Sequence, residues 1–169
     1  MGYEAQIAGI GDNSPYNGIK NPFIKILKKI SIKELRNRRI ACVKYLVEKG
    51  LQPTLINGGG TGSMESTIVE DEVTEITVGS GFFSPALFDY YDNFHHLPAA
   101  GFAIQIIRKP HEGMFTALGG GYVASGGMSL DKRPKPYLPE GIVLNNDEGT
   151  GEVQTPFVYK GNDALKIGD

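Results

Sequence analysis

The stretch LINGGGTGSMEST, residues 55–67, sets four glycines, a threonine and a serine directly behind a short apolar run. That run, residues 51–57, is apolar towards its end and typical of a buried strand. The glycines leave successive backbone N–H groups uncrowded, and Thr61 and Ser63 add hydroxyl groups. The pattern predicts a strand that ends in an anion cradle suited to a phosphate, with a plain flexible strand-to-helix loop as the alternative.

A second loop of the same kind follows the next predicted strand. Residues 73–81, VTEITVGSG, alternate as a strand should and then end in Gly79, Ser80 and Gly81. Two adjacent parallel strands that end this way would direct two sets of donors at one phosphate. In (β/α)₈ barrels, the phosphate site is formed by the loops after the seventh and eighth strands.

The elements around the two loops indicate an α/β unit in residues 1–93. The order is a strand over residues 3–7, helix, strand, short connection and strand. We expect a short helix over residues 21–30 and a second helix of roughly 17 residues that begins at a Ser31–Glu34 capping box. Its Lys and Arg side chains should form a solvated face, and Gly50 should end it.

Residues 94–169 have a different character and predict a separate all-β domain. Short β runs are separated by Gly, Pro, Asn and Asp, with no helical stripe among them. The runs are AAGFAIQIIRK, GMFTALGGGYVASGG, GIVLNN, GEVQTPFVY and LKIGD.

Composition excludes several classes of function. The formal net charge is −2 over 169 residues, with no block of like charges, which argues against nucleic acid or an acidic membrane as partner. No apolar stretch approaches the roughly 20 residues of a membrane span or has the layout of a signal peptide. The single cysteine, Cys42, cannot form an internal disulfide and is interpreted as a packing residue. We therefore expect a cytoplasmic protein.

Other motifs do not fit their context. A Walker A loop needs lysine where Gly62 stands. Residues 119–124, GGGYVA, match G-x-G-x-x-A but lie among β runs with no helix behind them, so tight turns or a bulge explain them better. No Cys, Asp or Glu stands at zinc spacing to His95, His96 or His111, so loop or core roles are predicted and no metal site.

Taken together, six motifs resemble the amino acid aldolase, deaminase and racemase branch of the fold-type III pyridoxal-phosphate enzymes, which includes D-threonine aldolases and D-serine dehydratase-like proteins. The motifs stand in the family's order over essentially the whole chain. They are GYEAQIAG, NGGGTGS, VTEITVGSGFF, ALGGGYVASG, PYLPEG and GEVQTP.

The resemblance implies a (β/α)₈ barrel that binds pyridoxal 5′-phosphate, followed by a β domain. Residues 1–93 would supply the last three barrel strands, and residues 94–169 most of the β domain. Tyr3 would reach the cofactor or substrate from the side. The cofactor-binding residues implied by the match are Gly60, Thr61, Ser63, Gly79, Ser80, Gly81 and Tyr3.

The sequence also departs from the family. The cofactor lysine of the first barrel strand and the metal ligands of the threonine aldolase type have no counterpart here, so no catalytic or metal-binding residue is assigned. Thr77 stands where relatives often have arginine, and Gly81 replaces a tyrosine. We therefore expect a carboxyl-terminal piece that needs the missing amino-terminal half of the barrel, or a homodimer partner, to cover its strand edges.

The predicted function is thus a part of a pyridoxal-phosphate-dependent aldolase, deaminase or racemase acting on small D- or β-hydroxy amino acids, inactive by itself. One alternative is a non-catalytic phosphate-binding or assembly module. Another is phosphosugar chemistry with Glu4 and Glu75 as an acid and base pair, although fold analogy is a weak guide to reaction.

Overall fold

The computed structural model describes residues 7–16, 18–122, 129–145 and 147–169. The chain divides into two compact units, Met1–Ala99 and Ala100–Asp169, and each is considered by itself. Tyr3, Glu4 and most of the strand predicted over residues 3–7 lie outside the described residues.

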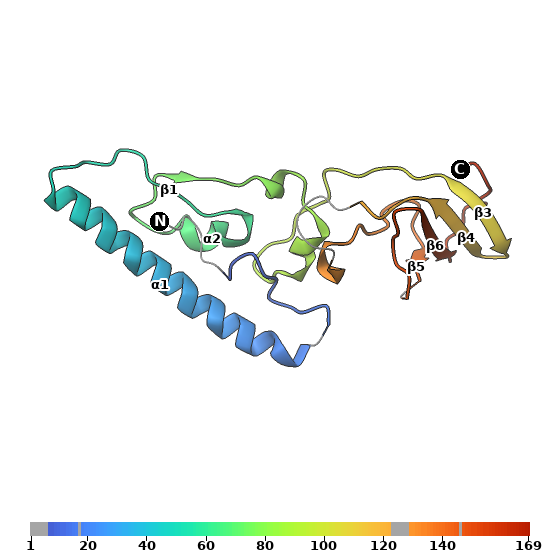
Figure 1. Cartoon of the computed structure of the whole chain (residues 1–169), viewed down its shortest axis with the longest axis horizontal. Coiled ribbons are helices and arrows are strands. Elements are labelled where there is room, and N and C mark those ends of the chain that lie inside the picture. The colour runs from blue at the N-terminus through green and yellow to red at the C-terminus, as the bar shows by residue number, and fades with distance from the viewer. Residues whose placement is uncertain (1–6, 17, 123–128, 146) are drawn as a thin grey trace. The chain divides into compact units, whose positions relative to one another are not determined.

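The first unit contains one long helix, α1, over Asn21–Glu48 (Figure 1). Pro22 lies at its start, where its fixed φ suits the first turn, and Gly50 follows its end, as the sequence predicts, with a φ of 79°. The prediction of two helices was wrong, because α1 continues through Ser31. No glycine or proline interrupts residues 23–48, so nothing gives Ser31 the non-helical backbone that a cap requires.

The expectation that the basic residues of the helix predicted from Ser31 form a solvated face was wrong for Arg39, and Lys28, from the shorter helix predicted before it, is buried as well. Lys28 and Arg39 are buried, with 7% and 5% of their surface exposed. Each is paired with a carboxylate, Asp12 for Lys28 and Glu70 for Arg39. Burial is tolerable because both partners are buried with them and neutralise their charge.

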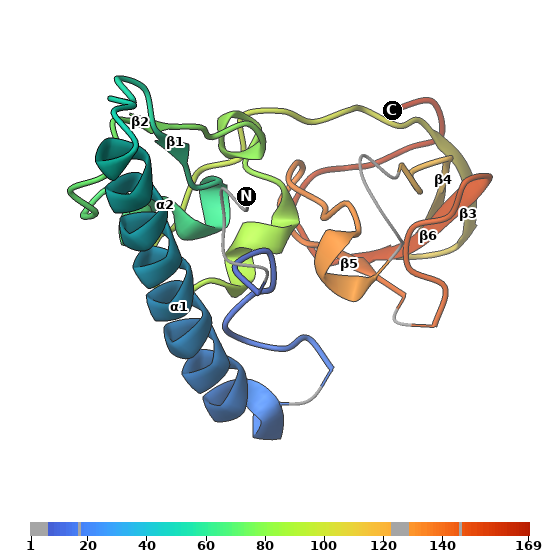
Figure 2. The same cartoon turned by 60° about the vertical axis from the view of Figure 1, so that its left-hand side comes forward.

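Two short parallel strands carry the glycine-rich loops. β1, Asn57–Gly58, pairs with β2, Glu75–Ile76, in the register Asn57 to Glu75 and Gly58 to Ile76 (Figure 2). Each strand is only two residues long, shorter than the sequence predicts, although hydrogen bonds from Thr74 N to Ile56 O and from Thr77 N to Gly58 O extend the contact. The parallel pairing places the residues after both strands at the same edge.

The connection between the two strands is short. After β1 come a 3₁₀ turn, Thr61–Ser63, and the one-turn helix α2, Met64–Thr67. After β2 come two further 3₁₀ turns, Ser80–Phe82 and Ala86–Tyr90.

Among the described residues, no helix is both long and apolar enough to cross a membrane.

The second unit is a four-stranded antiparallel sheet in the order β3-β4-β6-β5. Its core consists of Ile106, Phe115, Ala117 and Phe157, with the two phenylalanine rings stacked at 5.6 Å. The strands are β3, Ile106–His111; β4, Met114–Leu118; β5, Ile142–Leu144; and β6, Gln154–Tyr159. A further 3₁₀ turn covers Leu130–Lys132.

Four of the five predicted β runs therefore contain a strand. The fifth, LKIGD at residues 165–169, does not form one. It nevertheless bonds to the start of β3, where Ile106 N donates to Asp169 O and Gly168 N donates to Ile106 O. Gly168 has a φ of 101°, which turns the chain away from a continued ladder.

Candidate phosphate-binding site

The two glycine-rich loops meet through their hydroxyl side chains. Thr61 Oγ1 lies 3.3 Å from Ser80 Oγ, and the backbone N–H of Gly81 donates to Thr61 Oγ1 at 2.9 Å. Because that amide occupies an acceptor position of Thr61, the threonine proton can be donated to Ser80 or to a bound anion. The loops after β1 and β2 thus form one polar surface.

Both loops line a single pocket of about 520 Å³ within the first unit. A volume of this size lies in the range typical of small-molecule sites, about 300–1,000 Å³. The loop residues on its wall are Gly60, Thr61, Gly62, Gly79 and Ser80. The remaining wall includes Leu87, Phe88 and Tyr91 from the segment after the second loop.

The loop amides are candidate donors for a ligand. Within the described part of the chain, the N–H groups of Thr61, Gly62, Gly79 and Ser80 take part in no backbone hydrogen bond of a turn, loop or cap. Successive amides of this kind form anion-binding concavities, since each contributes a partial positive charge. Of the described residues, none that lines this pocket carries a charged side chain.

Ser63 has a different place from its neighbours. Its hydroxyl accepts a hydrogen bond from Gly60 N at 3.1 Å, and its own N–H donates to Gly60 O at 3.1 Å. Ser63 is buried and lines a second cavity of about 290 Å³ rather than the first. Ser63 therefore stabilises the conformation of the first loop through Gly60 and does not line the first pocket.

Close contacts require glycine at Gly62 and leave little room for a side chain at Gly81. A Cβ on Gly62 would lie 2.5 Å from Ala8 O and 2.7 Å from the Tyr91 hydroxyl, and one on Gly81 would lie 3.0 Å from Thr61 Cγ2. By contrast, a Cβ on Gly79 would meet no atom within 4 Å. Tight packing thus holds the first loop at Gly62 and holds the second against Thr61.

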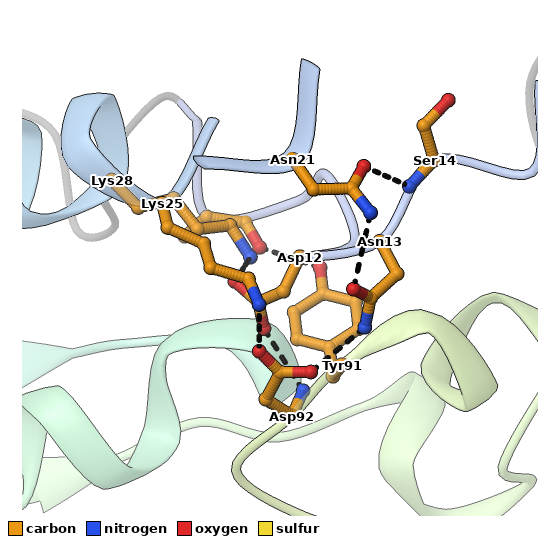
Figure 3. Close-up of polar contacts among 9 residues, drawn as sticks. Asp12, Asn13, Ser14, Asn21, Lys25, Lys28, Tyr91 and Asp92 are labelled. Carbon is orange, nitrogen blue, oxygen red and sulfur yellow. Dashed lines mark hydrogen bonds and ion pairs between the residues drawn. The ribbon is translucent and has the colours of Figure 1, made fainter. Parts of the chain in front are cut away.

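A buried polar cluster of Asp12, Lys28 and Tyr91, drawn in Figure 3, lies next to Gly62 through the Tyr91 hydroxyl. Lys28 Nζ lies 2.9 Å from Asp12 Oδ1 and 4.2 Å from the centre of the Tyr91 ring. The Tyr91 hydroxyl donates to Ala8 O at 2.5 Å. Tyr91 and Gly62 line both cavities, so they lie between the two cavities, and the contacts of the cluster hold Tyr91 in this position.

The cluster continues to a more exposed pair, Lys25 and Asp92, at 2.6 Å (Figure 3). Asn13 Nδ2 also donates to Asp92 Oδ1 at 2.7 Å. The hydrogen bond from Lys25, aided by that from Asn13, holds the pKa of Asp92 below its ordinary value of 3.8. The same contact raises the pKa of Lys25 above 10.5.

The lowered pKa of Asp92 predicts an acid-sensitive contribution to stability. This contribution is fully present above the unfolded pKa and is lost as the pH falls through the lower folded pKa, because protonation removes the ion pair. Between pH 5 and pH 2.5, the wild type should lose more stability than Asp92→Asn, as measured by urea unfolding. Equal losses in the two proteins would contradict the assignment.

A second buried ion pair joins α1 to the segment after α2. Arg39 Nη1 pairs with Glu70 Oε2, and both residues are at least 95% buried, with 5% and 4% of their surface exposed. A Cβ on Gly58, at the end of β1, would lie 3.1 Å from Arg39 Nη2. The guanidinium thus packs directly under the strand that carries the first loop.

The histidines do not gather into a site. His96 lies against Phe94, with ring centroids 4.8 Å apart, and His111 ends β3. Cys42 is partly buried in α1. In the described ranges, no three His, Cys, Asp or Glu side chains stand close enough to hold a metal ion.

The structure therefore brings Thr61, Ser80 and Gly81 into direct contact and sets Gly60 and Gly79 on the same pocket. Sequence reasoning missed the supporting residues Asp12, Lys28, Arg39, Glu70 and Tyr91. Lys28 and Arg39 could be recognised only as basic residues of a predicted helix, and such residues lie far more often on a solvated face. No sequence signal pointed to their partners.

Comparison with solved structures shows that the chain is similar in fold to a D-threonine aldolase. One matching structure is a crystal structure of D-threonine aldolase from Filomicrobium marinum, with a TM-score of 0.60 and 18% sequence identity. The match covers 84% of this chain and 37% of the aldolase chain, so the chain spans little more than a third of that enzyme. No protein-family model matches, and no curated protein matches significantly. The resemblance is thus confirmed for the fold, while the number of barrel strands stays a prediction.

Proposed function

We propose that the pocket binds the phosphate of pyridoxal 5′-phosphate, and that the chain is part of an aldolase, deaminase or racemase acting on small D- or β-hydroxy amino acids. One observation carries the proposal: Thr61 and Ser80, from the ends of adjacent parallel strands, lie 3.3 Å apart on the wall of one pocket. The fold shared with a D-threonine aldolase supports the choice of cofactor.

The residues present fit the phosphate end of this cofactor. Donors come from the hydroxyls of Thr61 and Ser80 and from the loop amides of residues 61, 62, 79 and 80. Charge-assisted hydrogen bonds from such groups are stronger than neutral ones, so a dianion can be held without lysine or arginine.

The chain's own share in the chemistry is to hold and orient the ligand. When bound to a substrate amine, this cofactor supplies an electron-accepting ring for bond breaking at the α-carbon. Among the described residues, no lysine lines the pocket, so an imine-forming lysine would have to come from another part of the enzyme. Thr61 and Ser80 would fix the phosphate and thereby the position of the ring.

A non-catalytic phosphate-binding module is the second candidate. It is favoured by the uncharged lining, which offers no acid or base for catalysis among the described residues. The two candidates differ in selectivity: a cofactor site should prefer the pyridine phosphate, whereas a simple module should bind inorganic phosphate equally well.

The first test is calorimetric titration with pyridoxine 5′-phosphate, which lacks the aldehyde and cannot form imines with surface lysines. We expect binding of this ligand and none of pyridoxine, because the phosphate supplies the main contact. Ser80→Ala should weaken binding about tenfold, since it removes one charge-assisted hydrogen bond.

Ser66→Ala is the matched control, because Ser66 donates to Ser63 O and does not line this pocket. It should bind as the wild type does. Equal binding of pyridoxine and its phosphate, or no effect of Ser80→Ala, would refute the phosphate assignment.

A further inference from the structure

The second cavity of the first unit, of about 290 Å³, differs from the phosphate pocket in the charge of its wall. Gly62 and Tyr91 lie between the two cavities. None of the described residues that line the phosphate pocket carries a charged side chain, whereas three cations and three anions line the second cavity. These charged residues are Lys25, Lys28, Lys29, Asp12, Glu65 and Asp92.

Four of these six charges are neutralised within the protein (Figure 3). Lys28 Nζ lies 2.9 Å from Asp12 Oδ1, and Asp12 Oδ2 accepts a hydrogen bond from Asp92 N at 3.0 Å. Lys25 Nζ lies 2.6 Å from Asp92 Oδ2, and Asp92 Oδ1 accepts a hydrogen bond from Asn13 Nδ2. Each carboxylate oxygen of Asp12 and Asp92 thus has a donor, so a ligand would find no unpaired charge at either ion pair.

Lys29 and Glu65 are the two charges that remain. Lys29 belongs to α1 and Glu65 to α2, and both side chains are exposed at the cavity. Among the described residues, neither forms an ion pair with any side chain, including the other. Two opposite charges that line one cavity without meeting can be bridged by a molecule that carries one charge of each sign.

We propose that the second cavity binds a small zwitterion, with the ligand carboxylate at Lys29 and the ligand ammonium group at Glu65. Both contacts would be charge-assisted hydrogen bonds. A purely anionic ligand would be repelled by Glu65, and a purely cationic ligand by Lys29. This site does not depend on the proposed phosphate site.

The rest of the wall limits the size of the ligand. The volume of about 290 Å³ lies just below the range of about 300–1,000 Å³ typical of small-molecule sites, so the ligand should have few atoms. Ile32 and Phe94 also line the cavity and are half-buried, so they offer apolar contact to a short aliphatic group between the two charges.

The test is a titration of the ¹⁵N-labelled full chain with glycine, acetate and methylammonium at constant ionic strength, followed by NMR. Glycine should shift the amide signals of Glu65, Ser66 and Asn93, which line the cavity, until they saturate. Acetate and methylammonium should bind at least about fivefold more weakly, because each retains only one of the two charge contacts. Equal binding of the three probes, or no saturable shift with glycine, would refute the proposal.

Lys29→Met and Glu65→Gln each remove one of the two contacts. Both residues are exposed, so the variants should fold, and each should weaken glycine binding about fivefold. Lys33→Met and Glu48→Gln are the matched controls, since both residues are exposed on α1 and do not line the cavity. Losses in Lys29→Met and Glu65→Gln no larger than those in the controls would refute the assignment.

Ser80→Ala separates this site from the phosphate site, because Ser80 lines only the phosphate pocket. Glycine affinity should be unchanged in this variant. A loss of glycine binding in Ser80→Ala would place glycine in the phosphate pocket and refute the second site. Glycine binding by a wild type that binds no inorganic phosphate would support the second site and refute the phosphate site alone.

Discussion

Arg39→Met is expected to destabilise the protein by about 3–5 kcal/mol, because it leaves the buried Glu70 carboxylate without its cation. Side chains of the pair are only 5% and 3% exposed, so water cannot replace the lost guanidinium. For a chain of this size, the loss corresponds to a fall in Tm of about 10 °C, at about 2–4 °C per kcal/mol. Thermal and urea unfolding measure it.

The neighbouring Arg38→Met is the matched control. Arg38 pairs with Glu34 at 2.8 Å on the exposed side of α1, with 74% and 57% of the side chains exposed. Pairs of this kind contribute about 0–1 kcal/mol. The double variant Arg39→Met/Glu70→Leu should recover most of the lost stability, since it removes both buried charges. An Arg39→Met variant as stable as Arg38→Met would show that the buried pair is not what joins α1 to the loop.

Gly62→Ala is expected to damage both stability and phosphate binding. The new Cβ would lie 2.5 Å from a backbone oxygen, Ala8 O, and 2.7 Å from the hydroxyl of the buried Tyr91. Neither neighbour is a free side-chain end, so the loop itself has to move. We expect a loss of about 2 kcal/mol, typical of overpacking, and at least tenfold weaker binding of inorganic phosphate.

Gly79→Ala tests whether steric contact causes the destabilisation expected for Gly62→Ala. Gly79 has an ordinary φ of −104°, and a Cβ there would meet no atom within 4 Å. The free energy of unfolding of the Gly79→Ala variant should stay within about 0.5 kcal/mol of the wild type. Equal destabilisation by the two alanines would mean that loop flexibility, rather than the contact with Tyr91, is what the glycines provide.

The parts of the site that follow from local sequence were predictable. Consecutive glycines with Thr61 and Ser80 at the ends of two predicted strands imply converging donors, and the structure brings these residues together. The helix end at Gly50 and the β structure of residues 106–159 follow in the same way from glycine and from β runs.

The supporting contacts were not predictable, because they depend on residues far apart in the chain. Lys28 and Asp92 reach Asp12, and Tyr91 reaches Ala8, across sequence separations that local patterns do not encode. The continuous helix was missed for a different reason. Ser31 and Glu34 form a capping pattern only if the chain before them is not helical, and Pro22 had already started the helix.

The central claim is that two loops from neighbouring strands hold one anion. Titration of the ¹⁵N-labelled protein with inorganic phosphate, followed by NMR, tests it most directly. The amide signals of Thr61, Gly62, Gly79 and Ser80 should shift together with a single Kd, while those of the second unit stay unchanged. Shifts confined to one loop, or different Kd values for the two loops, would contradict a shared site.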